Sequence, residues 1–406
     1  MCSENISDTI DIIGGTYHER CSEPVWREIY GSGLRAAYTI RAITDCCYIK
    51  LHTVADHYVK RHLDMHCPSL QIDLDVSEIY NSICFNYHHA LKPPFVHDVQ
   101  KVVDSINVNG ENCVVFGMLE TNTTVCAKRI VYDPQSPTNP SLLSSSGSKA
   151  DHVALVMNYQ EASLLANSSN IDEIRDYLFT QENCECLVLK MGPMGACVFA
   201  NRDSKGQNVP VYKTDFVWSI GSGDVFTAIF GYYWMIEGLD PYQSAMKASI
   251  GAASYCNLKR MDRLKQDIDN CPFVPIHPGV PGKVYLAGPF FSMAQRTFID
   301  ESYRTLKGIG LDVFSPFHDV GIGEAKEVVP KDIKALHECK VVYAVLDGMD
   351  PGTVFEVGYA VALQKRVVLF VQNEPTTHLQ MMVGTDCSIE KDFVTSIYKT
   401  YWSAIE

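Results

Sequence analysis

The second part of the chain alternates short apolar runs with amphipathic segments. The apolar runs are VYLA (284–287), LDVFS (311–315), VVYAVL (341–346) and VVLFV (367–371). Between and after them, helical periodicity is expected in residues 292–307, PKDIKALHEC (330–339, with Pro330 at its start), TVFEVGYAVALQ (353–364) and the final IEKDFVTSIYKTYW. Continuous apolar strands separated by helices are typical of a parallel sheet covered on both faces. We therefore predict a doubly wound α/β domain of flavodoxin type.

The first part is also mixed α/β, with a less regular pattern. Strands are expected at TIDIIGG (9–15), CVVFGML (113–119), AKRIVYD (127–133), HVALVMN (152–158) and CLVLKMG (186–192). A polar loop covers 134–148, and residues 221–238 form a Gly-rich turn that opens a long apolar helix. The proline- and glycine-rich stretch NCPFVPIHPGVPGK separates the two parts. We expect a domain over 1–272, a linker over 273–282 and a domain over 283–406.

Composition narrows the class of protein. The formal net charge of −14 argues against broad phosphate-mediated binding of nucleic acid. No run approaches the roughly 20 apolar residues of a membrane helix, and the start MCSENISDTI does not resemble a signal peptide. The 15 cysteines show no repeated metal spacing, since Cys184 and Cys186 form only CxC. We expect a cytoplasmic small-molecule protein with reduced thiols, no membrane contact and no structural metal.

Polar and aromatic residues gather where the C-terminal strands end, which is where open parallel sheets bind ligands. These strand ends are Gly288–Phe291, 315–319 and the acidic stretch from Asp347 to Glu356. Thr353-x-x-Glu356 also matches a capping box, so Glu356 has a structural interpretation beside the catalytic one. Asp332, near the expected start of its helix, has the same alternative.

The segments YLAGPFFS and PxDIxxLxxCxVVxAVLDGxDPGTxFExGYAxALxK resemble the nucleoside 2-deoxyribosyltransferase family over essentially the whole chain after the linker. The resemblance implies that Glu356 attacks C1′ of the sugar, that Asp332 helps proton transfer at the base, and that Asp350 is a further catalytic acid. It implies substrate contacts at Tyr285, Gly288, Phe290, Asp347 and Gly352. No cofactor is required. The family's Asn from a neighbouring subunit is replaced here by His378 or Gln380.

This chemistry matches the residue types. Departure of a base leaves an oxocarbenium-like sugar, which one carboxylate captures while an acid protonates the leaving nitrogen, as in retaining glycosidases. A second base then gives transfer, and water gives hydrolysis. The expected substrates are a nucleoside, a nucleotide or NAD. Family relatives complete their sites with a neighbour's residues, so a homo-oligomer is expected, with the aromatic tail IYKTYWSAI as part of the contact.

In the N-terminal part, Gly221-Ser222-Gly223-Asp224 at a helix start is a candidate anion hole with a base, although such a turn is more often only a turn. Together with IIGGT, GSGLRAA, VYDPQSP, NYQE, KMGPMGA and KASIGAAS, it resembles ribokinase-like (PfkB-type) kinases over about residues 8–260. The resemblance implies Asp224 as base, Mg²⁺ held through Asn158 and Glu161, and ATP near Gly192 and Gly195.

Two departures from the family pattern leave open whether the N-terminal part is an active kinase or a module that only binds a ligand. Trp218-Ser219-Ile220 precedes Gly221 where the family has Asp and a hydroxyl residue, and Tyr17-His18-Glu19-Arg20 is no familiar sugar-binding pattern. The leading hypothesis is glycosyl transfer or hydrolysis at an N-glycosidic bond. The alternatives are an NAD or nucleotide glycohydrolase controlled by a regulatory partner, a kinase with a nucleotide-binding C-terminal domain, and a sensor.

Overall fold

A computed structural model describes residues 8–99, 104–136 and 138–406. Residues 1–7, and Pro137 at the end of the VYDPQSP segment, lie outside this part. The chain forms two compact units. The first contains Thr214 and the described residues before it, with Trp218–His277; the second contains Asp215–Val217 and Pro278–Glu406. The division after His277 falls within the stretch 273–282.

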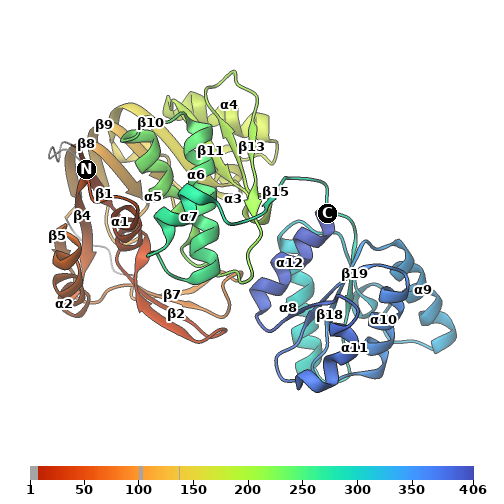
Figure 1. The fold of residues 1–406 in the computed structure, drawn as a ribbon. Coiled ribbons are helices and arrows are strands. Elements are labelled where there is room, and N and C mark those ends of the chain that lie inside the picture. The colour runs from red at the N-terminus through yellow and green to blue at the C-terminus, as the bar shows by residue number, and fades with distance from the viewer. Residues whose placement is uncertain (1–7, 100–103, 137) are drawn as a thin grey trace. The chain divides into compact units, whose positions relative to one another are not determined.

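The first unit is built on a nine-stranded sheet (Figure 1). In sheet order its strands are β13 (Gln207–Val209), β12 (Ala196–Phe199), β11 (Cys186–Lys190), β10 (Lys149–Asn158), β9 (Thr123–Asp133), β8 (Ile106–Phe116), β1 (Asp8–Ile13), β4 (Cys47–Ala55) and β5 (Ile72–Glu78). The pairs are parallel except those of β12 with β11 and β13. The five strands predicted from apolar runs are confirmed.

Helices cover both faces of this sheet. They are α1 (Gly31–Ile43), α2 (His57–His66), α3 (Tyr159–Ala166), α4 (Ile171–Glu182), α5 (Ser222–Met235), α6 (Pro241–Leu258) and α7 (Leu264–Asn270). Leu178 of α4 packs in one core with alternate strand residues such as Leu155 and Leu187. Gly231 of α5 faces Val114 and Val131 on the opposite face. The predicted Gly-rich turn and apolar helix are confirmed as Gly221 and α5.

Two smaller sheets complete the first unit. One is ordered β3 (Trp26–Ile29), β2 (His18–Cys21), β6 (Cys84–Tyr87) and β7 (Phe95–His97). The other pairs β14 (Val211–Tyr212) with β15 (Pro275–Ile276), so part of the expected linker is an edge strand. Short 3-10 turns lie at Pro68–Leu70, Leu143–Ser146 and Gly192–Met194.

The second unit has a five-stranded, all-parallel sheet. Its order is β17 (Val313–Phe314), β16 (Val284–Ala287), β18 (Val341–Val345), β19 (Arg366–Phe370) and β20 (Ser388–Glu390). In chain order this is 2-1-3-4-5, the flavodoxin-like arrangement, so the predicted fold class is confirmed. The chain leaves β16 and β18 in opposite directions, which opens a crevice at their carboxyl ends.

The helices of the second unit are α8 (Met293–Gly308), α9 (Ala325–Glu338), α10 (Pro351–Ala362), α11 (Gln380–Val383) and α12 (Phe393–Ile405), with turns at Pro316–Val320 and Thr376–Leu379. Figure 1 shows α8 and α12 on one face and α9 and α10 on the other. Leu336 of α9 and Val357 of α10 share a core with Tyr285 of β16.

Two predictions about these elements are wrong in detail. Helix α9 begins five residues before Pro330, which lies inside it. The IEKDFVTSIYKTYW segment starts as strand β20, and its helix begins only at Phe393. Tyr401 and Trp402 of the aromatic tail are buried, because α12 packs on β18, β19 and β20. The tail is therefore largely part of its own domain's core, and its part in a subunit contact stays a prediction.

Candidate functional sites

Tyr285 and Glu356 meet at the crevice between β16 and β18. Tyr285 is fully buried in β16 and stacks on Phe314 with ring centroids 5.5 Å apart. Its hydroxyl donates a hydrogen bond to Glu356 Oε1 at 2.5 Å. The carboxylate thus approaches from α10 and the hydroxyl from the neighbouring strand, so the orientation of Glu356 is set by two separate elements.

The position of Glu356 in its helix differs from the expectation. Helix α10 is capped by Asp350, whose Oδ2 accepts hydrogen bonds from Thr353 N at 2.8 Å and Thr353 Oγ1 at 3.0 Å. Thr353 is therefore the third helical residue and Glu356 the sixth, so the expected Thr353–Glu356 capping box does not form. The helix dipole acts on side chains in the first turn, and Glu356 lies beyond that turn.

Burial and the nearby carboxylates of Asp332 and Asp350 raise the pKa of Glu356 to about 7, against the lowering effect of the Tyr285 hydrogen bond. Near neutral pH both the protonated and the ionised form of this carboxyl group are therefore populated.

Asp332 lies on α9, the helix that precedes β18. Because α9 starts at Ala325, Asp332 is its eighth residue, so the first-turn role that was the structural alternative does not apply. Burial raises its pKa, against a lowering by Lys331. Within the described chain, its Oδ1 is buried without a hydrogen-bond partner. A buried, unpaired carboxyl oxygen near Glu356 is suited to hold or receive a proton.

Asp347 connects the loop after β18 to the loop after β19 by hydrogen bonds. Its carboxylate accepts hydrogen bonds from Gln372 N at 3.0 Å and Asn373 N at 2.8 Å, after β19. In return, Glu374 Oε1 accepts from Gly348 N at 2.9 Å and its Oε2 lies 3.1 Å from His378 Nδ1. This reciprocal clip fixes the loop that leads to Asp350. The sequence did not suggest Glu374, and substrate contact by Asp347 stays a prediction.

Aromatic side chains line the end of β16. Phe290 lies 5.4 Å, centroid to centroid, from both Phe291 and Phe317. A Cβ added to Gly288 would lie 2.4 Å from Ile299 Cδ1, so α8 can pack this closely only against glycine. A Cβ on Gly352 would lie 3.1 Å from Asp350 Oδ2, beside the helix cap. Both glycines thus keep the turns around the crevice compact.

In the first unit, Asp224 is the third residue of α5 and is buried. Both of its carboxylate oxygens are engaged. Arg35 Nη1 donates to Oδ2 at 2.6 Å, and Gln135 Nε2 donates to Oδ1. Arg35 also donates to Glu19, whose other oxygen accepts from Gly31 N at 2.9 Å. The sequence did not predict this Glu19–Arg35–Asp224 triad, since its members are distant along the chain.

Asn158 and Glu161, the expected organisers of Mg²⁺, bond to each other. Asn158 Oδ1 accepts from Glu161 N at 2.8 Å, and Glu161 Oε2 accepts from Asn158 N at 3.0 Å, a capping box for α3. Burial and Asp133 raise the pKa of Glu161 to about 7, partly offset by Lys190. Asp133 itself is paired with Lys190 and accepts from Thr227 Oγ1 at 2.8 Å.

The described acidic side chains near α3 form no metal-binding cluster by themselves. Across residues 8–99, 104–136 and 138–406, no group of three or more His, Cys, Asp or Glu side chains is arranged to hold an ion. The Mg²⁺ that the kinase resemblance implies at Asn158 and Glu161 stays a prediction. Gly192 and Gly195 have φ of +56° and +86°, so the turn they form requires glycine. Nucleotide contact by these two glycines stays a prediction.

The sequence departures before α5 also have a structural role. Trp218 is 1% exposed, with its ring 4.9 Å from that of Trp26 and Lys259 Nζ 3.8 Å from its centroid. Ile220 is buried as well. Both residues are core residues of the first unit, where the family's Asp and hydroxyl would instead be polar.

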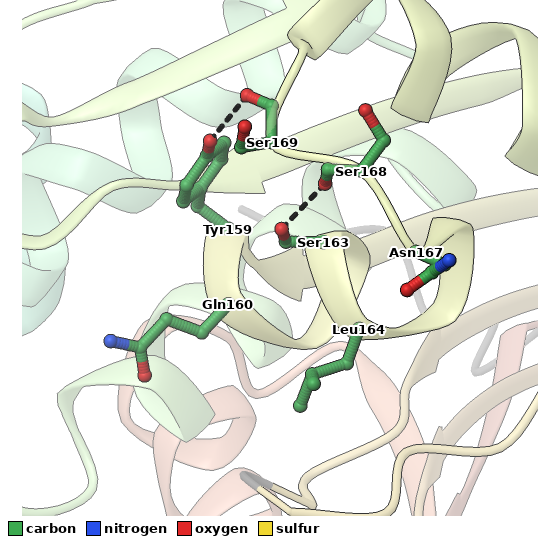
Figure 2. Close-up of a pocket in the computed structure, with 7 residues that line it drawn as sticks. All are labelled: Tyr159, Gln160, Ser163, Leu164, Asn167, Ser168 and Ser169. Carbon is green, nitrogen blue, oxygen red and sulfur yellow. Dashed lines mark hydrogen bonds between the residues drawn. The ribbon is translucent and has the colours of Figure 1, made fainter.

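A surface pocket lies beside α3 (Figure 2). It is lined by Tyr159, Gln160, Ser163, Leu164, Asn167, Ser168 and Ser169. The Tyr159 hydroxyl donates to Ser169 O at 2.6 Å and the Ser163 hydroxyl to Ser168 O at 2.5 Å. These bonds tie the helix to the loop that follows it. The pocket contains none of the site residues expected from the sequence.

Comparison with known proteins identifies both parts of the chain. The family model for nucleoside 2-deoxyribosyltransferases matches residues 284–392, and the model for pfkB family carbohydrate kinases matches residues 112–256. A relative, the uncharacterized protein UU063 of Ureaplasma parvum serovar 3 (strain ATCC 700970), is 32% identical over 127 residues. That match covers 27% of this chain and 73% of the relative.

Similar solved structures are ribokinase-family kinases. Ribokinase from Giardia lamblia is 13% identical, covering 65% of this chain and 98% of that one, with a TM-score of 0.49. Ribokinase from Thermotoga maritima is 13% identical, covering 64% and 98%, with a TM-score of 0.46. A Burkholderia thailandensis nucleoside kinase is 14% identical, covering 64% and 96%, with a TM-score of 0.46.

Along the described chain, no helix has the length and apolar character to cross a membrane.

The two family models together show that the chain combines a domain of the pfkB carbohydrate kinase family with a C-terminal domain of the nucleoside 2-deoxyribosyltransferase family.

Proposed function

We propose that the C-terminal domain cleaves or transfers at the N-glycosidic bond of a nucleoside or nucleotide through a covalent glycosyl–Glu356 intermediate. The observation that carries this proposal is the Glu356 carboxyl itself. It is half-buried at the crevice of a deoxyribosyltransferase-family domain and accepts a hydrogen bond from the Tyr285 hydroxyl at 2.5 Å. A nucleophilic carboxylate must be oriented toward the atom it attacks. The hydrogen bond from Tyr285 fixes one oxygen of Glu356, and the other oxygen can then face the sugar.

In the proposed first step, a Glu356 oxygen forms a bond to C1′ as the C1′–N bond to the base breaks. The electron pair of that bond stays with the leaving nitrogen, which receives a proton from Asp332. The raised pKa of Asp332 favours its holding this proton before the reaction. In the second step an acceptor base or water attacks C1′, gives its proton to Asp332, and releases Glu356.

Hydrolysis is the second candidate outcome, because of His378. This residue is one of two candidates for the position of the family's Asn, beside Gln380, and its Nδ1 lies 3.1 Å from Glu374 Oε2. Without the Asn that contacts the sugar in the family, water can complete the second step in place of a second base. An NAD or nucleotide glycohydrolase is the corresponding alternative for the substrate.

The test is incubation of the full-length protein with nucleosides, nucleotides and NAD, with and without a second base. Chromatography of free base and of exchanged nucleoside separates hydrolysis from transfer. A 2′-fluoro substrate with a reactive leaving base should add one sugar mass to the peptide containing Thr353 to Lys365. An active protein that gives an inverted sugar product and no adduct would refute the Glu356 intermediate.

A further inference from the structure

The Glu19–Arg35–Asp224 triad occupies the place where a kinase of this family would carry out its chemistry. A catalytic base must have an oxygen free to accept a proton from the substrate. Asp224 instead accepts from Arg35 at 2.6 Å through one oxygen and from Gln135 through the other. Both of its oxygens are thus engaged within the chain, and its negative charge is paired with Arg35.

The space beside the turn before α5 is occupied by the Arg35 side chain. Free backbone N–H groups at a helix N-terminus bind phosphate only if the anion can approach them. A Cβ on Gly221 would lie 2.1 Å from Arg35 Nε and 2.2 Å from Arg35 Cζ, so the guanidinium lies directly against this glycine. The Arg35 side chain is 1% exposed and thus takes up the space next to the turn.

A second side chain closes the neighbouring space. Tyr17 is buried and donates a hydrogen bond to Glu120 Oε2 at 2.9 Å. A Cβ on Gly15 would lie 1.8 Å from Tyr17 Cζ, so this ring packs against the end of β1 without a gap. Tyr17 and Arg35 thus each pack tightly against a glycine in this part of the domain.

Opening this region is costly. Arg35 is buried between two carboxylates that raise its pKa well above the ordinary value, against the effect of burial. Withdrawing Arg35 would leave Glu19 and Asp224 as buried, unpaired charges, which is strongly unfavourable. The arrangement is thus a stable part of the core.

We infer that the pfkB-family domain of this protein does not transfer phosphoryl groups, and that the Glu19–Arg35–Asp224 triad is a structural element that replaces its active site. This inference is independent of the proposed glycosyl chemistry, because all three residues belong to the first unit.

The sign of a stability change tests the inference. In the full-length protein, Asp224→Asn removes a charge that pairs with Arg35, so the melting temperature should fall by roughly 5 °C or more. Removal of an unpaired catalytic base would leave stability unchanged or increase it. Hydrogen–deuterium exchange should locate the loosening in α1 and α5. The matched control is Asp262→Asn, which removes an exposed pair with Arg260 and should shift the melting temperature by no more than about 1 °C.

An activity measurement completes the test. The full-length protein is incubated with ATP, Mg²⁺ and a panel of sugars and nucleosides, and ADP is measured. ADP should stay at the level without acceptor, and Asp224→Asn should not change it. Acceptor-dependent ADP formation that Asp224→Asn abolishes would overturn the inference, and so would an unchanged or higher melting temperature of that variant.

Discussion

Glu356 is the residue on which opposite electrostatic effects meet. Burial, Asp332 and Asp350 favour its neutral form, and the Tyr285 hydroxyl favours its anion. A nucleophilic carboxyl must be ionised, so the balance between these effects sets the pH range in which it can react.

Tyr285→Phe removes the only one of these effects that lowers the pKa of Glu356. We expect the acidic limb of the pH profile of kcat/KM to move upward by about one unit, the value of a charged hydrogen bond. The profile of base release measures this. Tyr303→Phe, a hydroxyl loss on α8 next to His318, is the control and should leave the limb in place. An unshifted limb in Tyr285→Phe would show that the hydroxyl does not act on Glu356.

Glu356→Gln should stabilise the protein at alkaline pH while abolishing base release. The pKa of Glu356 is about 7 in the folded state and near 4.5 when unfolded. The folded state therefore binds a proton between these values that the unfolded state does not, and stability falls as pH rises from about 4.5 to 7. The penalty above pH 7 is at most about 3 kcal/mol.

Thermal unfolding at pH 8 should therefore show a higher melting temperature for Glu356→Gln than for the wild type, with no gain at pH 4.5. Glu338→Gln, in an exposed pair with Lys334, is the control and should have no such pH-dependent effect. A variant that loses stability at pH 8 would mean that Glu356 is ionised and favourably paired in the fold.

The sequence identified Glu356, Asp332 and Tyr285 through the ordered family motif, but not their electrostatics. Thr353-x-x-Glu356 fits a capping box by spacing alone. Whether it forms depends on where the helix starts, and Asp350 claims the cap three residues earlier. The pKa of Glu356 depends on Asp332 and Tyr285, which come from other elements and are brought near it only by the fold.

At the scale of elements, α10 is the part that presents Glu356. Asp350 caps its first turn. The hydrogen bonds that Asp347 and Glu374 accept from backbone N–H groups of each other's loops fix the loop before the helix. The start of α10 therefore depends on side chains outside the helix.

Asp350→Ala should lower the free energy of unfolding by about 1 kcal/mol, because the Thr353 N–H loses its acceptor. Base release should also fall, since the turn before Glu356 frays. Asp350→Asn keeps an acceptor at the cap and should retain the melting temperature of the wild type. If Asp350→Asn keeps that stability but loses base release, the carboxylate takes part in the chemistry, as the family resemblance implies.

The elements that the sequence predicted are those with continuous apolar runs, such as β16, β18 and β19. The sheet of β2, β3, β6 and β7 was not predicted, because segments such as HERC and WREI carry charge and leave side chains partly exposed. Helix α9 was predicted to start at Pro330, since proline is favoured there. In the structure the preceding GEAKEV segment supplies an earlier start, and the proline is accommodated inside the helix.

At the scale of the whole molecule, the second unit exposes apolar side chains near the carboxyl ends of its strands. Phe291, Met293, Phe355, Met381 and Val383 are 68%, 85%, 60%, 76% and 59% exposed. They follow β16, β18 and β19, the strands that form the crevice. Exposed apolar side chains from adjacent loops are typical of an interaction surface.

We expect this surface to be covered by a second copy of the chain in a homo-oligomer. Light scattering at micromolar concentration should give a mass above that of one chain. Met381→Glu should lower the mass toward a single chain and reduce base release, because it places a charge in the contact. Lys307→Glu, at the far end of α8, is the control and should change neither. A fully active monomer would contradict the expectation.

The triad of Glu19, Arg35 and Asp224 also limits how this protein can evolve. Arg35 is 16 residues from Glu19 and 189 residues from Asp224 along the chain, yet it pairs with both. Loss of the arginine alone leaves two buried carboxylates without their partner. Across relatives, these three positions should therefore be inherited together. A homologue that has regained an open kinase cleft should be recognisable by a small or neutral residue at the position of Arg35.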